Sequence, residues 1–524
     1  MNAWMIWFGL MLSGPDTVVV CPPPARAAIA PWIERRTAQG YRITVVAPRP
    51  TARETREVIR RIAKTSILRT VVLVGDARGP IAVPTFGCPS PVGHRFGGTD
   101  RVASDNPYSD LDDDGIPDLA IGRFSVANER QLRDWYAKIV DFEQGRGPWR
   151  TRIELVAGVG GFSPLLDHAI DRAVARLLAR SLPATYTAHL TQADWRSPFC
   201  PDPRHFHRAT RRSLDRGSLF WIYMGHGHPF GLDRVAVPGA HFPIMSIDHI
   251  EQLDYQTAPS IAVLFACYTG AFYAEESFAE KLVRHRRGPV SALAASGVAM
   301  PYGMALLGDG MAHAFFEDHQ RTLGDVVFEA KRSLVDQHAL ARRQWLHWSA
   351  RLLSPNRNAL DAERREQIVL FQLLGDPLLQ LPAPERIELT GPDRARAGQS
   401  IELTANMPFP GRGHIELVAG LEQHRSRWPR RHAFHNDPRE LERYDTRYAK
   451  ANNRVLRKER VTFEQTGPRT ISLRLPDTAR GAAHVVIYTE SSSGRFAVGQ
   501  LDLRIDGAAR NVARETSASP MAGG

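Results

Sequence analysis

The sequence predicts an α/β core with a parallel sheet in two subdomains, followed by a β-sandwich. Compact apolar runs rich in β-branched residues alternate with helical stretches up to about residue 382. This alternation is typical of parallel strands joined by crossover helices. From residue 386 onward, short alternating segments separated by Gly and Pro turns favour a sandwich of antiparallel strands.

The composition narrows the class of protein. At 524 residues, the chain is too long for one compact domain. The formal net charge of +11 comes from arginines scattered among acidic residues, so we expect no nucleic-acid partner. The four cysteines are too dispersed for a disulfide framework or a zinc motif.

The chain begins with an apolar run over residues 1–13 that is too short to span a bilayer. We therefore expect no transmembrane span, and residues 1–15 are interpreted as a signal or leader segment. This interpretation favours a secreted or cell-envelope protein over a cytoplasmic one.

The first predicted subdomain covers residues 16–147. Thr51 and Glu54 have the spacing of a capping box, which predicts a helix from there to about residue 64. Strands are expected at residues 16–21, 41–46 and 71–74.

The second predicted subdomain covers residues 148–383, and the sandwich covers residues 384–506. Strands of the second subdomain are expected at residues 153–157, 219–223, 261–266 and 290–295, and helices at 165–180, 277–284 and 311–318. A charged insertion at about residues 424–460 interrupts the sandwich, and residues 507–524 are expected to be disordered.

A histidine and a cysteine follow two of the expected strands. His226 comes shortly after the strand at 219–223, and Cys267 directly after the strand at 261–266. Sites in open parallel sheets lie outside the carboxyl ends of the strands. A nearby imidazole can take the proton of a thiol that is mostly protonated at neutral pH. The amides of Gly227 and Cys267 are candidate oxyanion donors.

A structural interpretation of the same residues stays open at this point. Cysteine is among the most frequently buried residue types, so Cys267 could be a core residue and His226 a loop histidine. The spacing alone does not decide between the two.

Two segments carry a family resemblance. The sequences WIYMGHGHP (residues 221–229) and LFACYTGAF (264–272) resemble the His and Cys motifs of the gingipain family of cysteine peptidases, which belongs to a caspase-like clan. Further similar segments are VVLVGD (71–76), PDLAIGRF (117–124), SFAEKLV (277–283), LAASG (293–297) and LLGDPLLQL (373–381).

The resemblance implies a caspase-like core, an immunoglobulin-like sandwich and a thiol peptidase. It implies Cys267 as the nucleophile and His226 as the general acid/base, acting through a thioester. Arginine-specific gingipains orient the histidine with a glutamate, but the matching position here is about Val159, which implies a plain dyad.

The resemblance also implies a specificity pocket. Residues 165–178 are similar to a family segment whose aspartate lines the pocket for a basic P1 side chain. Asp167 matches that aspartate, and Tyr302 falls near an aromatic residue that covers the pocket. The alternative is that Asp167 simply caps a helix.

An acidic loop predicts a structural calcium site. The carboxylates of Asp110, Asp112, Asp114 and Asp118 surround Gly115, as in the opening of a calcium loop. The usual glutamate at the twelfth position is replaced by Ile121. A solvated acidic turn is the alternative.

The combined prediction is a cysteine endopeptidase acting on protein or peptide substrates. Catalysis is expected to need no cofactor, and Ca²⁺ is expected only as a structural ion. Two alternatives stay open: a related hydrolase or transpeptidase with the same dyad, and a non-catalytic calcium-stabilised surface or scaffold protein.

Overall fold

The structure is a computed structural model that describes residues 14–158, 182–273, 275–353, 358–420 and 428–507. Its contacts divide the chain into two compact units. The first comprises Met1–Ala383 with Trp428–Asn453, and the second comprises Pro384–Arg427 with Arg454–Gly524. Each unit has an apolar core of its own.

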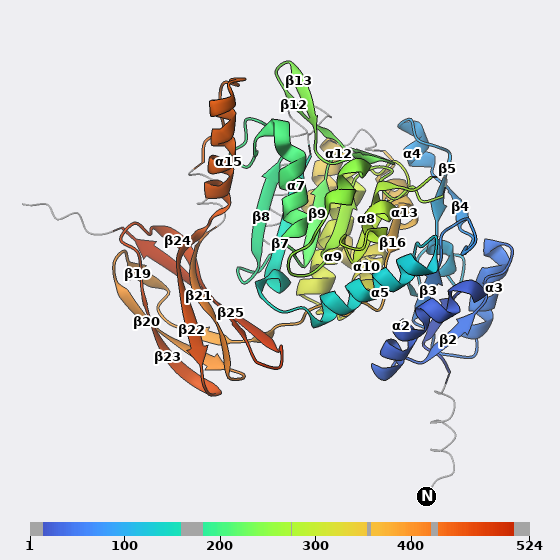
Figure 1. Ribbon diagram of the computed structural model, residues 1–524, viewed down its shortest axis with the longest axis horizontal. Helices are drawn as coiled ribbons and strands as arrows, with labels where there is room; N and C mark the ends of the chain where they lie inside the picture. Colours follow the sequence, from blue (N-terminus) through green and yellow to red (C-terminus); the bar gives the residue numbers. More distant parts are fainter. Residues whose placement is uncertain (1–13, 159–181, 274, 354–357, 421–427, 508–524) are drawn as a thin grey trace, which may run out of the picture. The chain divides into compact units, whose positions relative to one another are not determined.

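A ten-stranded sheet forms the centre of the first unit (Figure 1). Neighbouring strands are parallel except β15 and β16, which pair antiparallel. The sheet therefore has two parallel halves that run in opposite directions. In spatial order, the strands are β2 (Ile43–Val46), β1 (Thr17–Val20), β3 (Thr70–Val74), β6 (Ala120–Phe124), β16 (Phe371–Leu374), β15 (Ser291–Ala295), β14 (Ile261–Phe265), β9 (Phe220–Met224), β7 (Arg152–Ala157) and β8 (Thr187–Gln192).

Burial explains why most of these strands could be predicted. Every residue of β1, β3, β14, β15 and β16 is buried, as expected for parallel strands covered by helices on both faces. The predicted mixed α/β core with a mostly parallel sheet is confirmed. Strands β6, β8 and β16 were not among the predicted strands; β8 is an edge strand that is only partly buried and mixes polar with apolar residues.

Helices cover both faces of the sheet. Helices α2 (Arg26–Ala38), α5 (Glu129–Gln144) and α8 (Phe278–Arg284) lie in front of it in Figure 1, and α9 (Pro301–Phe316) and α10 (Leu323–Arg332) lie behind it. Helix α3 (Ala52–Ala63) starts at the predicted capping box, where the Glu54 amide donates to Thr51 Oγ1 at 3.2 Å.

The predicted helices at 311–318 and 165–180 have different outcomes. The predicted helix at 311–318 is part of the longer α9, which begins ten residues earlier because Pro301 is well suited to a first helical turn. The predicted helix at 165–180 lies outside the described residues.

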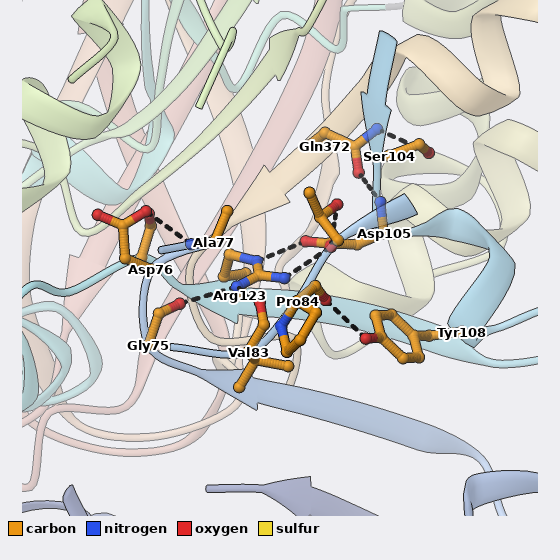
Figure 2. A network of polar contacts seen from close by, with 12 residues as sticks. Gly75, Asp76, Ala77, Val83, Pro84, Ser104, Asp105, Tyr108, Arg123 and Gln372 are labelled. Atoms are coloured by element: carbon orange, nitrogen blue, oxygen red, sulfur yellow. Dashed lines mark hydrogen bonds and ion pairs between the residues drawn. The ribbon is translucent and has the colours of Figure 1, made fainter. Parts of the chain in front are cut away.

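A buried arginine on β6 connects several segments of the first unit (Figure 2). Arg123 Nε and Nη2 lie 2.6 and 2.7 Å from the two carboxylate oxygens of Asp105. Its Nη1 donates to the carbonyls of Gly75 and Val83, both at 2.9 Å. The guanidinium carbon also lies 5.4 Å from the ring centroid of Phe272, in the segment that follows β14. This network therefore supports the loop that carries the cysteine.

The second unit contains two sheets that share one apolar core. In β20, buried and exposed residues alternate strictly, as expected for a strand with one face on a core. The predicted antiparallel strands are confirmed, and the immunoglobulin-like assignment stays a prediction. One sheet contains β18 (Glu388–Thr390), β20 (Ser400–Met407) and β23 (Gly467–Arg474); the other contains β17 (Glu385–Arg386), β19 (Arg394–Arg396), β21 (Gly411–Ala419), β22 (Val455–Phe463), β24 (Gly481–Glu490) and β25 (Phe496–Asp506).

Part of the charged insertion belongs to the first unit. Helix α15 (Pro438–Asn452) covers the outer edge of β8, where the Asn452 amide exchanges hydrogen bonds of 2.8 and 2.9 Å with the backbone of Leu190. Tyr448 Oη lies 2.7 Å from Thr191 Oγ1. The side chains thus satisfy backbone groups that an edge strand leaves unpaired. No helix among the described residues is long and apolar enough to cross a bilayer.

Candidate active site

His226 and Cys267 emerge from adjacent parallel strands at the same edge of the sheet. Phe265 at the end of β14 pairs with Met224 at the end of β9, and the Gly225 amide still donates to the Phe265 carbonyl at 3.2 Å. His226 and Cys267 each lie two positions after these paired residues. The tertiary structure thus brings together the two residues that the sequence singled out.

Gly227 allows the histidine loop to lie directly against the cysteine turn. A Cβ atom at this position would be 2.8 Å from Ala266 Cβ and from Thr269 Cγ2, and 2.9 Å from the Cys267 carbonyl oxygen. Such distances are shorter than any side chain tolerates, so glycine is required here. The backbone of the histidine loop and the backbone of the cysteine turn are consequently in contact.

The Cys267 thiol is partly enclosed and accepts a backbone hydrogen bond. The Ala299 amide donates to Cys267 Sγ at 3.3 Å. Burial raises the pKa of the Cys267 thiol, and the Ala299 hydrogen bond opposes this rise. An enclosed thiol of this kind needs a base or a positive partner to ionise at neutral pH.

The residue after the cysteine has an unusual backbone. Tyr268 has a φ of 58°, in the left-handed region that side chains other than Asn and Asp rarely adopt. Its amide donates to the Gly297 carbonyl at 3.0 Å, which holds the turn in place. Strained backbone of this kind is concentrated at functional sites.

The other three cysteines lie in different surroundings. All four thiols are free, and burial raises the pKa of both Cys21 and Cys88 to about 11. Cys200 is fully buried. A raised pKa is therefore common to the cysteines, and what distinguishes Cys267 is its position beside His226 at the strand ends.

The sequence profile of peptidase family C25 matches residues 11–382. The chain belongs to peptidase family C25. The gingipain resemblance is thereby confirmed, and the protein is a cysteine peptidase. A comparison of its sequence with curated proteins returns no match.

Solved structures share the fold of this C25 peptidase. The Arg-specific cysteine proteinase gingipain R (RGPB) is 16% identical with a TM-score of 0.53, covering 94% of this chain and 98% of that one. The complex of Porphyromonas gingivalis RgpB pro- and mature domains is 16% identical with a TM-score of 0.52, covering 94% and 100%. A further protease structure is 15% identical with a TM-score of 0.54, covering 93% and 96%. At such identities the likeness concerns the fold.

The predicted specificity residues of this C25 peptidase have separate outcomes. Tyr302 lies in the first turn of α9 and is buried, with its Oη 3.1 Å from His347 Nδ1. It follows Ala299 by three positions, but its role in a P1 pocket stays a prediction. Asp167 and Val159 lie outside the described residues, so their predicted roles also stay predictions.

The acidic loop brings together three of the four predicted calcium ligands. Carboxylate oxygens of Asp110, Asp112 and Asp118 all lie within 4.8 Å of one another. Asp114 is outside this group, and its carboxylate accepts a hydrogen bond of 2.7 Å from the Ile116 amide. Three carboxylate oxygens at this spacing fit a hard divalent cation.

A cavity of about 470 Å³ lies elsewhere in this C25 peptidase. It is lined by residues of α9, α10 and α11 (Gln337–Arg342), and neither His226 nor Cys267 is among them. The lining includes His313 and Ala314, near the opposite end of α9 from Tyr302. The chemistry at the strand ends, rather than this cavity, therefore defines the candidate active site.

Sequence reasoning missed two contributors to the site. Ala299 acts through its backbone amide, which leaves no signal in the identity of the residue. Tyr223 is the last tyrosine before the histidine, and its Oη donates to the His226 carbonyl at 2.7 Å. A polar hydroxyl in an otherwise apolar strand was the signal that could have identified it.

Proposed function

We propose that this cysteine peptidase is an endopeptidase in which Cys267 and His226 form a catalytic dyad. The observation that carries the proposal is the contact of the Gly227 backbone with the turn at Cys267, at the ends of two adjacent parallel strands. This contact supports a thiol and an imidazole acting on the same substrate atom. Peptidase family C25 supports peptide bonds as the substrate class.

The proposed reaction begins with transfer of the thiol proton from Cys267 to His226. The thiolate attacks the scissile carbonyl carbon, and the negative charge passes to the carbonyl oxygen. The amides of Gly227 and Cys267 are the proposed donors to this oxyanion. The imidazolium then protonates the departing amine as the carbon–nitrogen bond breaks, which leaves a thioester on Cys267.

Hydrolysis of the thioester completes the cycle. His226 takes a proton from water, and the resulting hydroxide attacks the thioester carbon. The intermediate collapses to the carboxylic acid, which releases its proton to solvent, and the sulfur leaves as a thiolate that regains its proton from His226. The complete cycle returns the dyad to its starting protonation state, so the residues of this chain and one water suffice for proton balance.

We further propose a preference for Arg or Lys at P1, with Asp167 as the countercharge and Tyr302 as a wall of the pocket. The support is the resemblance of residues 165–178 to the family segment that lines this pocket. A carboxylate in a narrow apolar slot would pair with a guanidinium or an ammonium group.

A structural calcium ion is proposed at Asp110, Asp112 and Asp118. The proximity of their oxygens supports it, together with the mutual repulsion of carboxylates in the absence of a cation. The ion would stabilise the loop between β5 (Arg101–Ser104) and β6 and would take no part in catalysis.

The proposed dyad is tested with a peptidyl electrophile and with fluorogenic peptides. We expect stoichiometric labelling at Cys267, and loss of both labelling and turnover in Cys267→Ala. His226→Ala should strongly slow labelling. Cys88→Ala, which removes another partly exposed thiol, is the matched control and should behave as wild type.

Three results would contradict the proposal. Folded protein that neither reacts with the electrophile nor cleaves any peptide in a diverse library would favour a non-catalytic surface or scaffold role. Transfer of the acyl group to an added amine in preference to water would favour a transpeptidase. Labelling at Cys88 in place of Cys267 would remove the nucleophile assignment.

A further inference from the structure

The hydroxyl of Tyr223 contacts the histidine loop at its first residue. Tyr223 is fully buried, and its Oη donates to the His226 carbonyl at 2.7 Å. Burial raises the pKa of Tyr223, the charges of Asp233 and Cys267 raise it further, and a hydrogen bond from the Asp233 backbone opposes the rise. The phenol oxygen is therefore bonded to the backbone at the start of the loop from His226 to Asp233.

Two glycines leave room for this hydroxyl. A Cβ atom at Gly158 would lie 2.6 Å from Tyr223 Oη, and a Cβ atom at Gly225 would lie 2.7 Å from it. The Gly158 amide donates to the Met224 carbonyl at 2.7 Å, so the backbone is paired on this side until the loop begins. The hydroxyl thus occupies a narrow slot between the ends of β7 and β9.

The loop that Tyr223 contacts is the one that carries the imidazole. Gly227 and His228 pair as β10 with Gly231 and Leu232 of β11, so the loop is a short hairpin. A two-residue ladder is marginally stable by itself and needs support from the surrounding protein. The hydrogen bond from Tyr223 Oη to the carbonyl at its start provides such support.

We infer that Tyr223 is a positioning residue of the proposed dyad, orienting His226 through the backbone with its phenol hydroxyl. The inference rests on the proposed function, because it requires that His226 act on Cys267. Small displacements of a catalytic group cost large factors in rate.

The test is a double-mutant cycle between Tyr223→Phe and His226→Ala. The measured quantity is the rate of alkylation of Cys267 by iodoacetamide between pH 5 and 10, followed by mass spectrometry of the Cys267 peptide. We expect Tyr223→Phe to lower the rate at pH 7 on the order of tenfold and to shift the pH profile towards that of His226→Ala. In the His226→Ala background, Tyr223→Phe should have no further effect.

Tyr108→Phe is the matched control. Tyr108 is also fully buried, and its Oη donates to a backbone carbonyl, that of Pro84, at 2.6 Å. Loss of this bond should leave the pH profile of Cys267 unchanged. If Tyr223→Phe fails to fold, Gly158→Ala is the second variant, because its methyl group displaces the hydroxyl without removing it and should shift the profile in the same direction.

The outcomes separate the inference from the proposed function. If the alkylation rate of Cys267 depends on pH in the same way in wild type and in His226→Ala, both the dyad and the role of Tyr223 are overturned. If wild type differs from His226→Ala but Tyr223→Phe matches wild type, the role of Tyr223 alone is overturned. A further outcome is that Tyr223→Phe lowers the alkylation rate by the same factor in the wild type and in His226→Ala. That result would also overturn the role of Tyr223, because a merely structural role acts independently of His226.

Discussion

Arg36 and Asp376 lie 340 residues apart in the sequence, and they form an ion pair in which Nη2 is 2.5 Å from Oδ2. Both side chains are fully buried. Arg36 also pairs with Glu143 at 2.7 Å, and Trp32 Nε1 donates to Asp376 Oδ2 at 2.5 Å. Helices α2 and α5 are thereby joined to the segment that follows β16.

Removal of the Asp376 charge should strongly destabilise the first unit. Asp376→Asn leaves Arg36 with Glu143 as its remaining carboxylate, and breaking a buried pair typically costs roughly 3–5 kcal/mol. We expect a loss near the lower end of this range in urea unfolding followed by tryptophan fluorescence. Glu129→Gln, which removes the exposed pair with Arg133 on α5, is the control and should change little. Equal effects of the two variants would contradict the prediction.

The buried Lys138 should make stability depend on pH. Burial lowers the pKa of Lys138 to about 7, and its Nζ donates to the carbonyls of Val283, His285 and Pro289. Between about pH 7 and the ordinary lysine value of 10.5, the unfolded chain binds a proton that the folded chain does not. The free energy of unfolding should therefore rise with pH in this window, by up to about 1.4 kcal/mol per pH unit.

Lys138→Met should make the free energy of unfolding rise less steeply with pH. It should also destabilise the protein, because three carbonyls lose their donor. Lys331, whose pKa burial also lowers to about 7, should account for the slope that remains. Lys281→Met is the control, since Lys281 pairs with Glu251 and its pKa is raised instead. An unchanged slope in Lys138→Met would show that its ammonium keeps its proton throughout.

The acidic loop predicts a selective response to calcium. Addition of Ca²⁺ should raise the Tm of the wild type, and Asp112→Asn should abolish the rise because it removes one of three ligands. Asp114→Asn is the matched control, since Asp114 lies outside the cluster and should leave the rise intact. A Tm that chelation and Ca²⁺ leave unchanged would support the solvated acidic turn.

Gly227→Ala should separate activity from folding. The added methyl group would meet Ala266 and Thr269 at 2.8 Å, which displaces the histidine loop from the cysteine turn. We expect a loss of kcat/KM on the order of a hundredfold and a stability cost of about 1–3 kcal/mol. Gly87→Ala, whose methyl group would meet Arg101 at an ordinary 3.4 Å, should retain activity. Full activity in Gly227→Ala would contradict the close contact.

The proposed P1 pocket predicts a change of selectivity. Asp167→Asn should lower kcat/KM for substrates with Arg at P1 roughly 10- to 100-fold, because a charge-assisted hydrogen bond is lost. Substrates with Leu at P1 should be affected little. Fluorogenic peptides that differ only at P1 measure both values. A uniform loss for both substrates would indicate that Asp167 acts as a helix cap.

Most core strands, and the position of the two candidate residues at the strand ends, could be predicted because their signals are local. The apolar run at residues 261–265 is buried on both faces, and Cys267 follows it closely in the chain. A parallel pairing with β9 then suffices to bring His226 to the same edge. Which of the four predicted calcium ligands lie close together could not be predicted from the sequence, since the course of the loop backbone decides which carboxylates converge.

By itself, the sequence determined the order of most core strands, the two candidate catalytic residues and the family resemblance. These properties depend on local periodicity and on short motifs. Only the tertiary structure decided that β15 and β16 join two opposed halves of one sheet, that α15 covers β8, and that Tyr223 bonds to the His226 carbonyl. The physical reason is that hydrogen bonds between distant segments depend on where backbone groups come to lie, and residue spacing does not encode this.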